Sequence, residues 1–193
     1  MPTVRIDDDL EMFYRVDDFT DPWTEPGTVL MLHGNSESGA VWFGWVPTLA
    51  RHYRVLRPDM RGFGQSTPMP VDFPWSLDVI ADDYAAFLEK LETGPVHVVA
   101  AKIGGTAARR FAARHPKWFR SLTLVGTPTP RREGVYGNIP SWMEEFSRPG
   151  GVETWARRTM GGRLGSDFPP RASTGGPATW ARRRRRRSSA SCR

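Results

Sequence analysis

The chain has 193 residues, of which 39% are hydrophobic and 25% are charged, a length and balance typical of one globular domain and not of a disordered protein. The formal net charge is +6, but residues 171–193 contain eight arginines and no acidic residue. Removing those eight charges leaves about −2 for residues 1–170. The basic character therefore belongs to the tail and does not indicate a nucleic-acid-binding domain.

The sequence also excludes several other classes of protein. It has no apolar run of roughly 18 residues, so we expect no membrane-spanning segment, and its first ten residues carry acids where a signal peptide would be apolar. Cys192 is the single cysteine, which rules out an internal disulfide and a multi-cysteine zinc site. We expect a cytoplasmic protein with no metal ion and no other cofactor.

In chain order, the first predicted elements are a β-hairpin and a buried strand. Residues 3–6 and 11–16 mix polar and apolar side chains on either side of three aspartates, which is typical of a hairpin. Residues 28–32 form an apolar run bounded by Gly27 and Gly34, the pattern of a buried parallel strand.

A helix, a strand and a second helix are predicted next. Residues 41–53 have apolar side chains at helix-like spacing, and residues 54–56 lead as a short strand into a loop. Residues 76–93 give the clearest helical pattern, with a serine to cap the start and Gly94 and Pro95 to end the helix.

The remaining pattern alternates strands and helices. Residues 96–100 and 121–125 read as strands, and they flank a helix predicted over residues 106–114. This order favours an α/β fold with a doubly wound, mostly parallel sheet. Residues 139–160 turn helical again.

Three motifs follow predicted strands: His33-Gly34-Asn35, the segment 59–66 (Asp-Met-Arg-Gly-Phe-Gly-Gln-Ser), and the segment 100–106 (Ala-Ala-Lys-Ile-Gly-Gly-Thr). In this order and spacing they resemble the α/β-hydrolase fold family, with the esterase, enol-lactonase and bromoperoxidase-like branches closest, over roughly residues 1–170. The resemblance implies a small-molecule substrate.

The resemblance also assigns jobs to single residues. It implies an oxyanion hole built from the backbone N–H groups of Asn35 and Ile103, which would stabilise charge on a carbonyl oxygen. His33, Gly34 and Gly104 would shape the two loops that carry these donors. The segment 59–66 is structural in the family.

One position departs from the family pattern Gly-x-Ser-x-Gly. Here the register is Ala100-Ala101-Lys102-Ile103-Gly104, so Lys102 stands in the place of the nucleophile, and no serine occurs between Thr93 and Ser121. Acyl transfer through a serine at this turn is therefore excluded.

Three roles for Lys102 remain open. A helix N-terminus and a partly desolvated site both disfavour a cation, so a neutral lysine could act as a base or form a Schiff base with a carbonyl substrate. A charged lysine could instead hold an anionic ligand beside the oxyanion-hole amides. The third reading is a protein of this family without catalysis.

The other triad members are not found in the sequence. In the family the acid and the histidine follow the nucleophile, yet His115, at the end of a predicted helix, is the only histidine after Lys102 and is read as structural. We expect a C-terminally truncated chain that is poorly stable and inactive as a hydrolase. Residues 1–127 would be the N-terminal part of the core and residues 128–170 a partial helical cap.

Residues 171–193 lack Leu, Ile, Val and Phe and include six consecutive arginines, which predicts a disordered tail. Arg, Ala, Gly, Pro and Ser are also what GC-rich DNA encodes out of frame, so we hypothesise a frameshift near residues 165–171. The alternative is a genuine basic tail that binds phosphates through charge alone. A specific nucleic-acid partner is not expected, because no second basic patch or set of stacking aromatics accompanies the tail.

Overall fold

The computed structural model describes residues 2–35, 37–70, 72–128, 144–145 and 148–160. The chain divides into two compact units, Met1–Thr129 and Pro130–Arg193.

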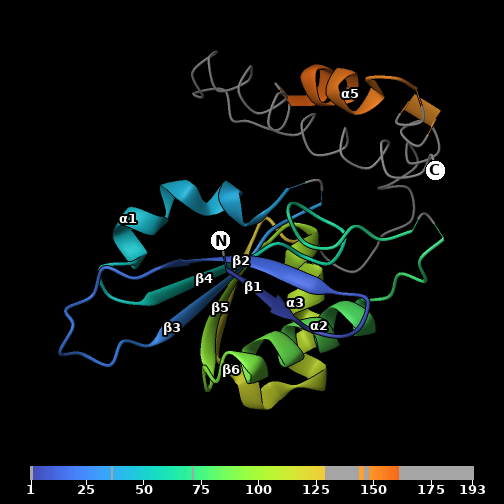
Figure 1. Ribbon diagram of the computed structural model, residues 1–193. Coiled ribbons are helices and arrows are strands. Elements are labelled where there is room, and N and C mark those ends of the chain that lie inside the picture. Colours follow the sequence, from blue (N-terminus) through green and yellow to red (C-terminus); the bar gives the residue numbers. More distant parts are fainter. Residues whose placement is uncertain (1, 36, 71, 129–143, 146–147, 161–193) are drawn as a thin grey trace. The chain divides into compact units, whose positions relative to one another are not determined.

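A six-stranded sheet forms the centre of the first unit. Its strands are β1 (Thr3–Arg5), β2 (Glu11–Asp17), β3 (Thr28–Leu32), β4 (Arg54–Pro58), β5 (Val96–Ala101) and β6 (Phe119–Val125). They lie in the order β1-β2-β4-β3-β5-β6 (Figure 1). β2 pairs antiparallel with β1 and β4, whereas β4, β3, β5 and β6 run parallel to one another. The predicted hairpin and the predicted α/β class with a mostly parallel sheet are both confirmed.

Helices cover both faces of this sheet. They are the 3-10 helix η1 (Gly39–Gly44), α1 (Val46–Leu49), α2 (Leu77–Lys90), α3 (Ile103–Arg114) and the 3-10 helix η2 (Pro116–Trp118). Successive side chains of a strand point to opposite faces. In β3, Leu30 and Leu32 belong to a buried cluster with side chains of α2 and α3, and Val29 and Met31 belong to a second cluster with side chains of η1 and α1. Figure 1 shows the same division, with α1 on one side of the sheet and α2 and α3 on the other.

The helix predicted over residues 76–93 is confirmed in place and in capping. It forms as α2, and the hydroxyl of Ser76 accepts a hydrogen bond from the N–H of Val79 at 3.1 Å, as a serine N-cap does. The single helix predicted over residues 41–53 is wrong, because the chain forms η1 and the four-residue α1 instead. Gly44 weakens a helix at this point, and Pro47 fits only in the first turn of a new one.

α3 begins earlier than the sequence predicted. Its first residue is Ile103 rather than Thr106, so Gly104 and Gly105 lie inside the helix instead of in the loop before it. Both glycines sit against other parts of the chain, which is why side chains are absent there. A Cβ on Gly104 would lie 2.3 Å from the carbonyl oxygen of His33, and one on Gly105 would lie 1.9 Å from the hydroxyl of Thr127.

In the second unit the structure describes α5 (Gly151–Met160), which falls inside the helical stretch predicted over residues 139–160. Much of the predicted cap (residues 128–170) and all of the predicted tail (residues 171–193) lie outside the described residues. No helix in the described part of the chain is long and apolar enough to cross a membrane.

Candidate active site

The chain reverses its direction across the sheet at β3. It runs from β3 to β4 on one side, and then crosses to β5 on the other side of β3. The carboxyl ends of β3 and β5 therefore form a topological switch point, where open α/β sheets bind their ligands. Two connections begin at this point: the β3 turn, of which the structure describes residues 33–35 and 37–38, and the elbow, where Lys102 joins β5 to α3.

The elbow has an unusual backbone. Lys102 has φ 54° and ψ −128°, and Glu92 is the only other residue besides glycine with a positive φ in the described part of the chain. Such a conformation costs an L-residue about 1–3 kcal/mol and persists only where the surroundings impose it. Here β5 continues to the preceding residue, and the N–H of Lys102 donates to the carbonyl oxygen of Val125 at 3.1 Å. Strain of this kind concentrates at functional sites.

The β3 turn and the elbow are in direct contact. A Cβ on Gly34 would lie 2.8 Å from Oε2 of Glu37 and 3.0 Å from Cδ of Lys102. Gly104, in the first turn of α3, also lies close to the end of β3. A Cβ on Gly104 would lie 2.3 Å from the carbonyl oxygen of His33 and 2.9 Å from that of Leu32. Glycine at both positions allows the two turns to meet.

His33 fixes the start of the β3 turn. Its side chain is fully buried, Nε2 accepts a hydrogen bond from the N–H of Met60 at 2.9 Å, and Nδ1 lies 2.8 Å from the carbonyl oxygen of Gly34. Because Nε2 is an acceptor, the network assigns the ring proton to Nδ1, which then donates to Gly34. The imidazole orients backbone and has no ring nitrogen left for acid–base work.

Glu37 was not among the residues singled out from the sequence, yet it joins the two turns. Its side chain is only 4% exposed. Oε2 accepts a hydrogen bond from the N–H of Gly34 at 2.9 Å, and Oε1 forms a direct ion pair with Nζ of Lys102. The Lys102 side chain remains 55% exposed, so it is less desolvated than the sequence suggested. The signal in the sequence was a lone acid between a buried strand and the next helix.

Asn35 and Ile103 lie where the two turns place them. Asn35 follows Gly34 and is exposed, and Ile103 is the first residue of α3. The N–H groups of a first helical turn have no acceptor within the helix, so that of Ile103 is suited to bind an oxygen. That Asn35 and Ile103 together form an oxyanion hole stays a prediction.

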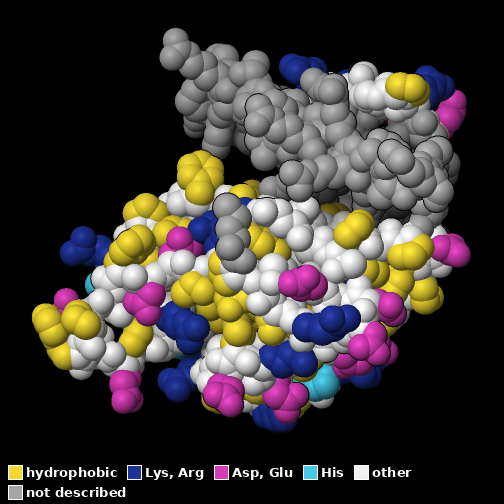
Figure 2. All heavy atoms as spheres, viewed as in Figure 1, with side chains coloured by type: hydrophobic (Ala, Val, Ile, Leu, Met, Phe, Trp, Pro, Cys, Tyr) yellow, Lys and Arg dark blue, Asp and Glu magenta, His cyan; other side chains and the backbone are white. Residues whose placement is uncertain are grey.

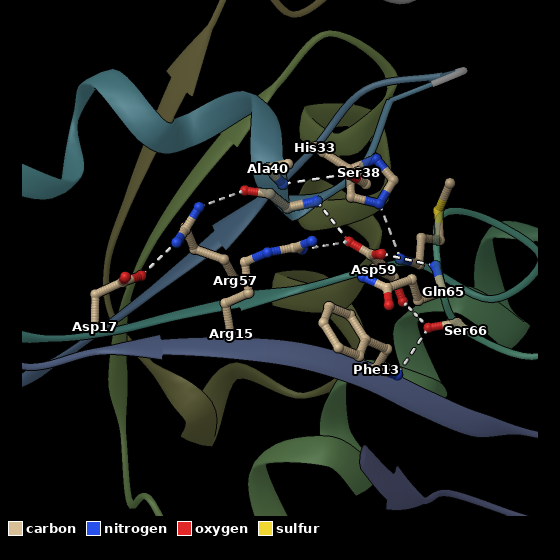
Figure 3. Close-up of polar contacts among 12 residues, drawn as sticks. Phe13, Arg15, Asp17, His33, Ser38, Ala40, Arg57, Asp59, Gln65 and Ser66 are labelled. Atoms are coloured by element: carbon tan, nitrogen blue, oxygen red, sulfur yellow. Dashed lines mark hydrogen bonds and ion pairs between the residues drawn. The ribbon is translucent and has the colours of Figure 1, made fainter. Parts of the chain in front are cut away.

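The segment 59–66, which follows β4, holds the β3 turn through hydrogen bonds (Figure 3).

 
The carboxylate of Asp59 is fully buried and accepts hydrogen bonds from the N–H groups of Gly39 at 2.7 Å and Gln65 at 2.9 Å. The hydroxyl of Ser66 donates to the carbonyl oxygen of Asp59 and accepts from the N–H of Phe13 at 2.9 Å. These hydrogen bonds all go to backbone N–H or carbonyl groups, so they hold the turns in place.

Arg61 lies in a separate buried ion cluster. Its guanidinium pairs with both carboxylate oxygens of Asp83, at 2.8 and 2.6 Å, and with Asp7. Burial raises the pKa of Asp83, and the hydrogen bonds and charge of Arg61 oppose that rise. The cluster connects the segment after β4 to α2 and does not reach the elbow.

The remaining histidines are not placed to act with Lys102. Nε2 of His115 lies 2.6 Å from a carboxylate oxygen of Asp82, at the C-terminal end of α3. With 12 residues in α3 and about 1.5 Å of rise per residue, the two ends of that helix are roughly 18 Å apart. His97 lies near the start of β5 and contacts Ser121, and His52 follows α1. Among the described residues no group of three or more His, Cys, Asp or Glu side chains could hold a metal ion.

The sheet topology and the paired turns at its switch point define the class of protein. The sequence pattern of the family described as alpha/beta hydrolase fold matches residues 27–190. The chain therefore belongs to the α/β-hydrolase family, and the resemblance inferred from the three motifs is confirmed.

Individual relatives match this chain over part of their own length. A 2-hydroxymuconate semialdehyde hydrolase of Pseudomonas sp. (strain CF600) is 34% identical over an alignment of 125 residues, and the match covers 60% of this chain and 44% of that protein. A pimeloyl-(acyl-carrier protein) methyl ester esterase of Aeromonas hydrophila is 37% identical over 99 residues, 51% of this chain and 37% of the esterase. The enol-lactonase of Burkholderia xenovorans LB400 has the same fold, with a TM-score of 0.76 at 20% identity over 94% of this chain and 66% of the lactonase. The chain thus spans less than half the length of the two sequence relatives.

Proposed function

We propose that this chain binds small carbonyl compounds at the elbow, where the amine of Lys102 takes the place of the serine nucleophile. The observation that carries the proposal is the strained backbone of Lys102, held at the switch point against the β3 turn. Two relatives support the carbonyl class, since the name of one contains a semialdehyde and the name of the other a methyl ester.

The chemistry open to such a site is that of an amine. A lysine adds to the carbonyl carbon of an aldehyde or ketone and forms an imine, and the N–H groups of Asn35 and Ile103 would hold the carbonyl oxygen during the addition. Hydrolysis of esters by a serine mechanism is not expected, because Lys102 stands at the elbow and His115 lies at the far end of α3.

Reductive trapping tests this proposal. The chain is incubated with propanal and cyanoborohydride, and the reduced adduct is located by peptide mass mapping. Lys90 and Lys117 are the other two lysines of the chain and are both exposed, so they serve as internal references. We expect an adduct at Lys102 well before the other two lysines react.

The matched control is Lys102→Arg, which keeps a cation beside Glu37 but cannot form an imine. Equal labelling of all three lysines would refute the proposal.

A second function, binding of small anions without turnover, is favoured by the ion pair itself. Lys102 already holds one carboxylate, that of Glu37, and an ammonium group has three N–H donors. Its 55% exposure leaves room for a ligand to approach. This function predicts saturable binding of acetate or butyrate in titration calorimetry, lost in Lys102→Ala, with no adduct at Lys102 in the trapping experiment.

A further inference from the structure

We propose that Glu37 is the proton-transfer partner of Lys102 when the amine reacts with a small aldehyde or ketone. The inference rests on the proposed function, because it assigns a second residue to the same reaction. It starts from the carboxylate of Glu37, which is in direct contact with Nζ of Lys102.

Glu37 is a buried, hydrogen-bonded group beside an exposed one. Its carboxylate is buried, and Oε2 is held by the backbone N–H of Gly34 at 2.9 Å. Oε1 is directed at Nζ of Lys102, whose side chain is more than half exposed. A substrate can therefore approach the amine from the solvent side while the carboxylate stays in place.

The position of the pair also explains why an acid is needed there. Lys102 is the N-cap residue of α3, and the positive end of a helix dipole disfavours a cation. The carboxylate of Glu37 supplies the opposing negative charge. In the same contact it is an acceptor for the proton that the ammonium group must release before it can act as a nucleophile.

The reaction balances with these two residues and the substrate alone. Glu37 takes one proton from the ammonium group of Lys102, and the nitrogen lone pair forms a bond to the carbonyl carbon while the π electrons move to oxygen. A proton passes from the nitrogen to that oxygen, which gives a carbinolamine. Glu37 then returns its proton to the hydroxyl group, the nitrogen lone pair forms the C=N bond as the C–O bond breaks, and water leaves to give the protonated imine. Glu37 ends as a carboxylate.

The other titratable groups packed around the two turns are engaged elsewhere. His33 is hydrogen-bonded to the backbone of Met60 and Gly34, and Asp59 accepts the N–H of Gly39. The guanidinium of Arg57 donates to the carbonyl oxygen of Gly39 and pairs with Asp17. Glu37 is therefore the group whose removal should change how the reaction at Lys102 depends on pH.

A purely structural Glu37 is the competing explanation, because the carboxylate also ties the β3 turn to the elbow. The two roles differ in what Glu37→Gln does. A glutamine amide can still accept the hydrogen bond from Gly34 and occupies the same volume, but it cannot take a proton from Lys102.

The test is site-resolved trapping with propanal between pH 6 and 9 in the full chain, in the wild type and in Glu37→Gln. We expect the rate at Lys102 to fall by about a hundredfold in Glu37→Gln near neutral pH, the scale of general acid–base assistance. The rates at Lys90 and Lys117 should not change. In Glu37→Gln, the trapping rate at Lys102 should rise with pH as steeply as the rates at Lys90 and Lys117. In the wild type, the trapping rate at Lys102 should rise less steeply with pH than the rates at those two lysines.

Glu89→Gln, which removes the same charge from the exposed surface of α2, is the control and should leave all three rates unchanged. Thermal melting identifies a variant that is unfolded at the assay temperature. If Glu37→Gln is unfolded, Glu37→Asp is measured instead, and it should react at Lys102 more slowly than the wild type but faster than the exposed lysines.

The outcomes separate the two proposals. If the wild type shows no preference for Lys102, the proposed function fails and this inference fails with it. If the wild type prefers Lys102 but a folded Glu37 variant keeps both the rate and the pH profile, the proposed function stands and the role of Glu37 is refuted.

Discussion

At the scale of single residues, the site is defined by the ion pair between Glu37 and Lys102. The serine that the family pattern has at position 102 carries no charge and would not need a carboxylate beside it. Glu37 is 4% exposed, and Lys102 is the cation that the structure places beside it. When both members of an ion pair are buried, removing one of them lowers the free energy of unfolding by about 3–5 kcal/mol. Because Lys102 is more than half exposed, solvent screens the pair and a smaller cost applies.

Lys102→Ser should therefore destabilise the fold by about 1–3 kcal/mol, the usual penalty for a buried polar group left unsatisfied, because the carboxylate of Glu37 loses its ion pair. The double variant Lys102→Ser with Glu37→Gln should recover part of the loss, because no buried charge is then left without its cation. Urea unfolding of the wild type, both single variants and the double variant gives the coupling free energy.

Lys90→Ser, an exposed lysine in the last turn of α2, is the control for losing a lysine and should change the free energy of unfolding only slightly. Strictly additive effects of the two site substitutions would show that the pair contributes nothing to the fold.

At the scale of elements, the site depends on how closely the start of α3 approaches the end of β3. The approach is made at Gly104, where a Cβ would lie 2.3 Å from the carbonyl oxygen of His33 and 2.9 Å from that of Leu32. Both neighbours are backbone atoms at the end of a central strand, so they cannot move aside as a flexible side chain would.

Gly104→Ala should therefore push α3 away from β3 and destabilise the fold by about 1–3 kcal/mol, as overpacking in a core does. The same displacement should separate Ile103 and Lys102 from the β3 turn and slow trapping at Lys102. Gly44→Ala is the matched control, since nothing lies within 4 Å of a Cβ at that position. Thermal melting should show a clear loss for Gly104→Ala alone, and equal melting temperatures for both variants would contradict the close approach.

The same elements show what could be predicted from the sequence. The buried strands at β3 and β5 were visible because continuous apolar runs reflect burial on both faces, and Ser76 marked the start of α2. The start of α3 was missed, since two glycines indicate a loop until the backbone packed against Gly104 and the side chain packed against Gly105 are known. Glu37 was missed for a related reason: its partner Lys102 is 65 residues away in the chain, and only the sheet topology brings the two turns together.

At the scale of the whole molecule, the excess of basic charge belongs to residues 171–193 of the sequence. The described surface of the first unit mixes acidic, basic and apolar side chains (Figure 2), including the aromatic rings of Phe19, Trp23 and Phe43, which are 70–80% exposed. β6 pairs on one side with β5, and among the described residues no strand pairs with its other edge.

The arginines of residues 171–193 lead to a prediction about nucleic acid that is independent of the elbow. Eight cations without an acid should bind RNA or DNA through phosphates alone, and the logarithm of the binding constant should fall with the logarithm of salt concentration with a slope of at most about −5 to −7. Fluorescence anisotropy with labelled oligonucleotides of unrelated sequence measures this slope. Replacing the six arginines at 182–187 by glutamine, which keeps the length of the chain, should remove most of the affinity and leave trapping at Lys102 unchanged. A preference for one oligonucleotide sequence, or binding that survives the substitution, would show instead that the folded part of the chain recognises nucleic acid.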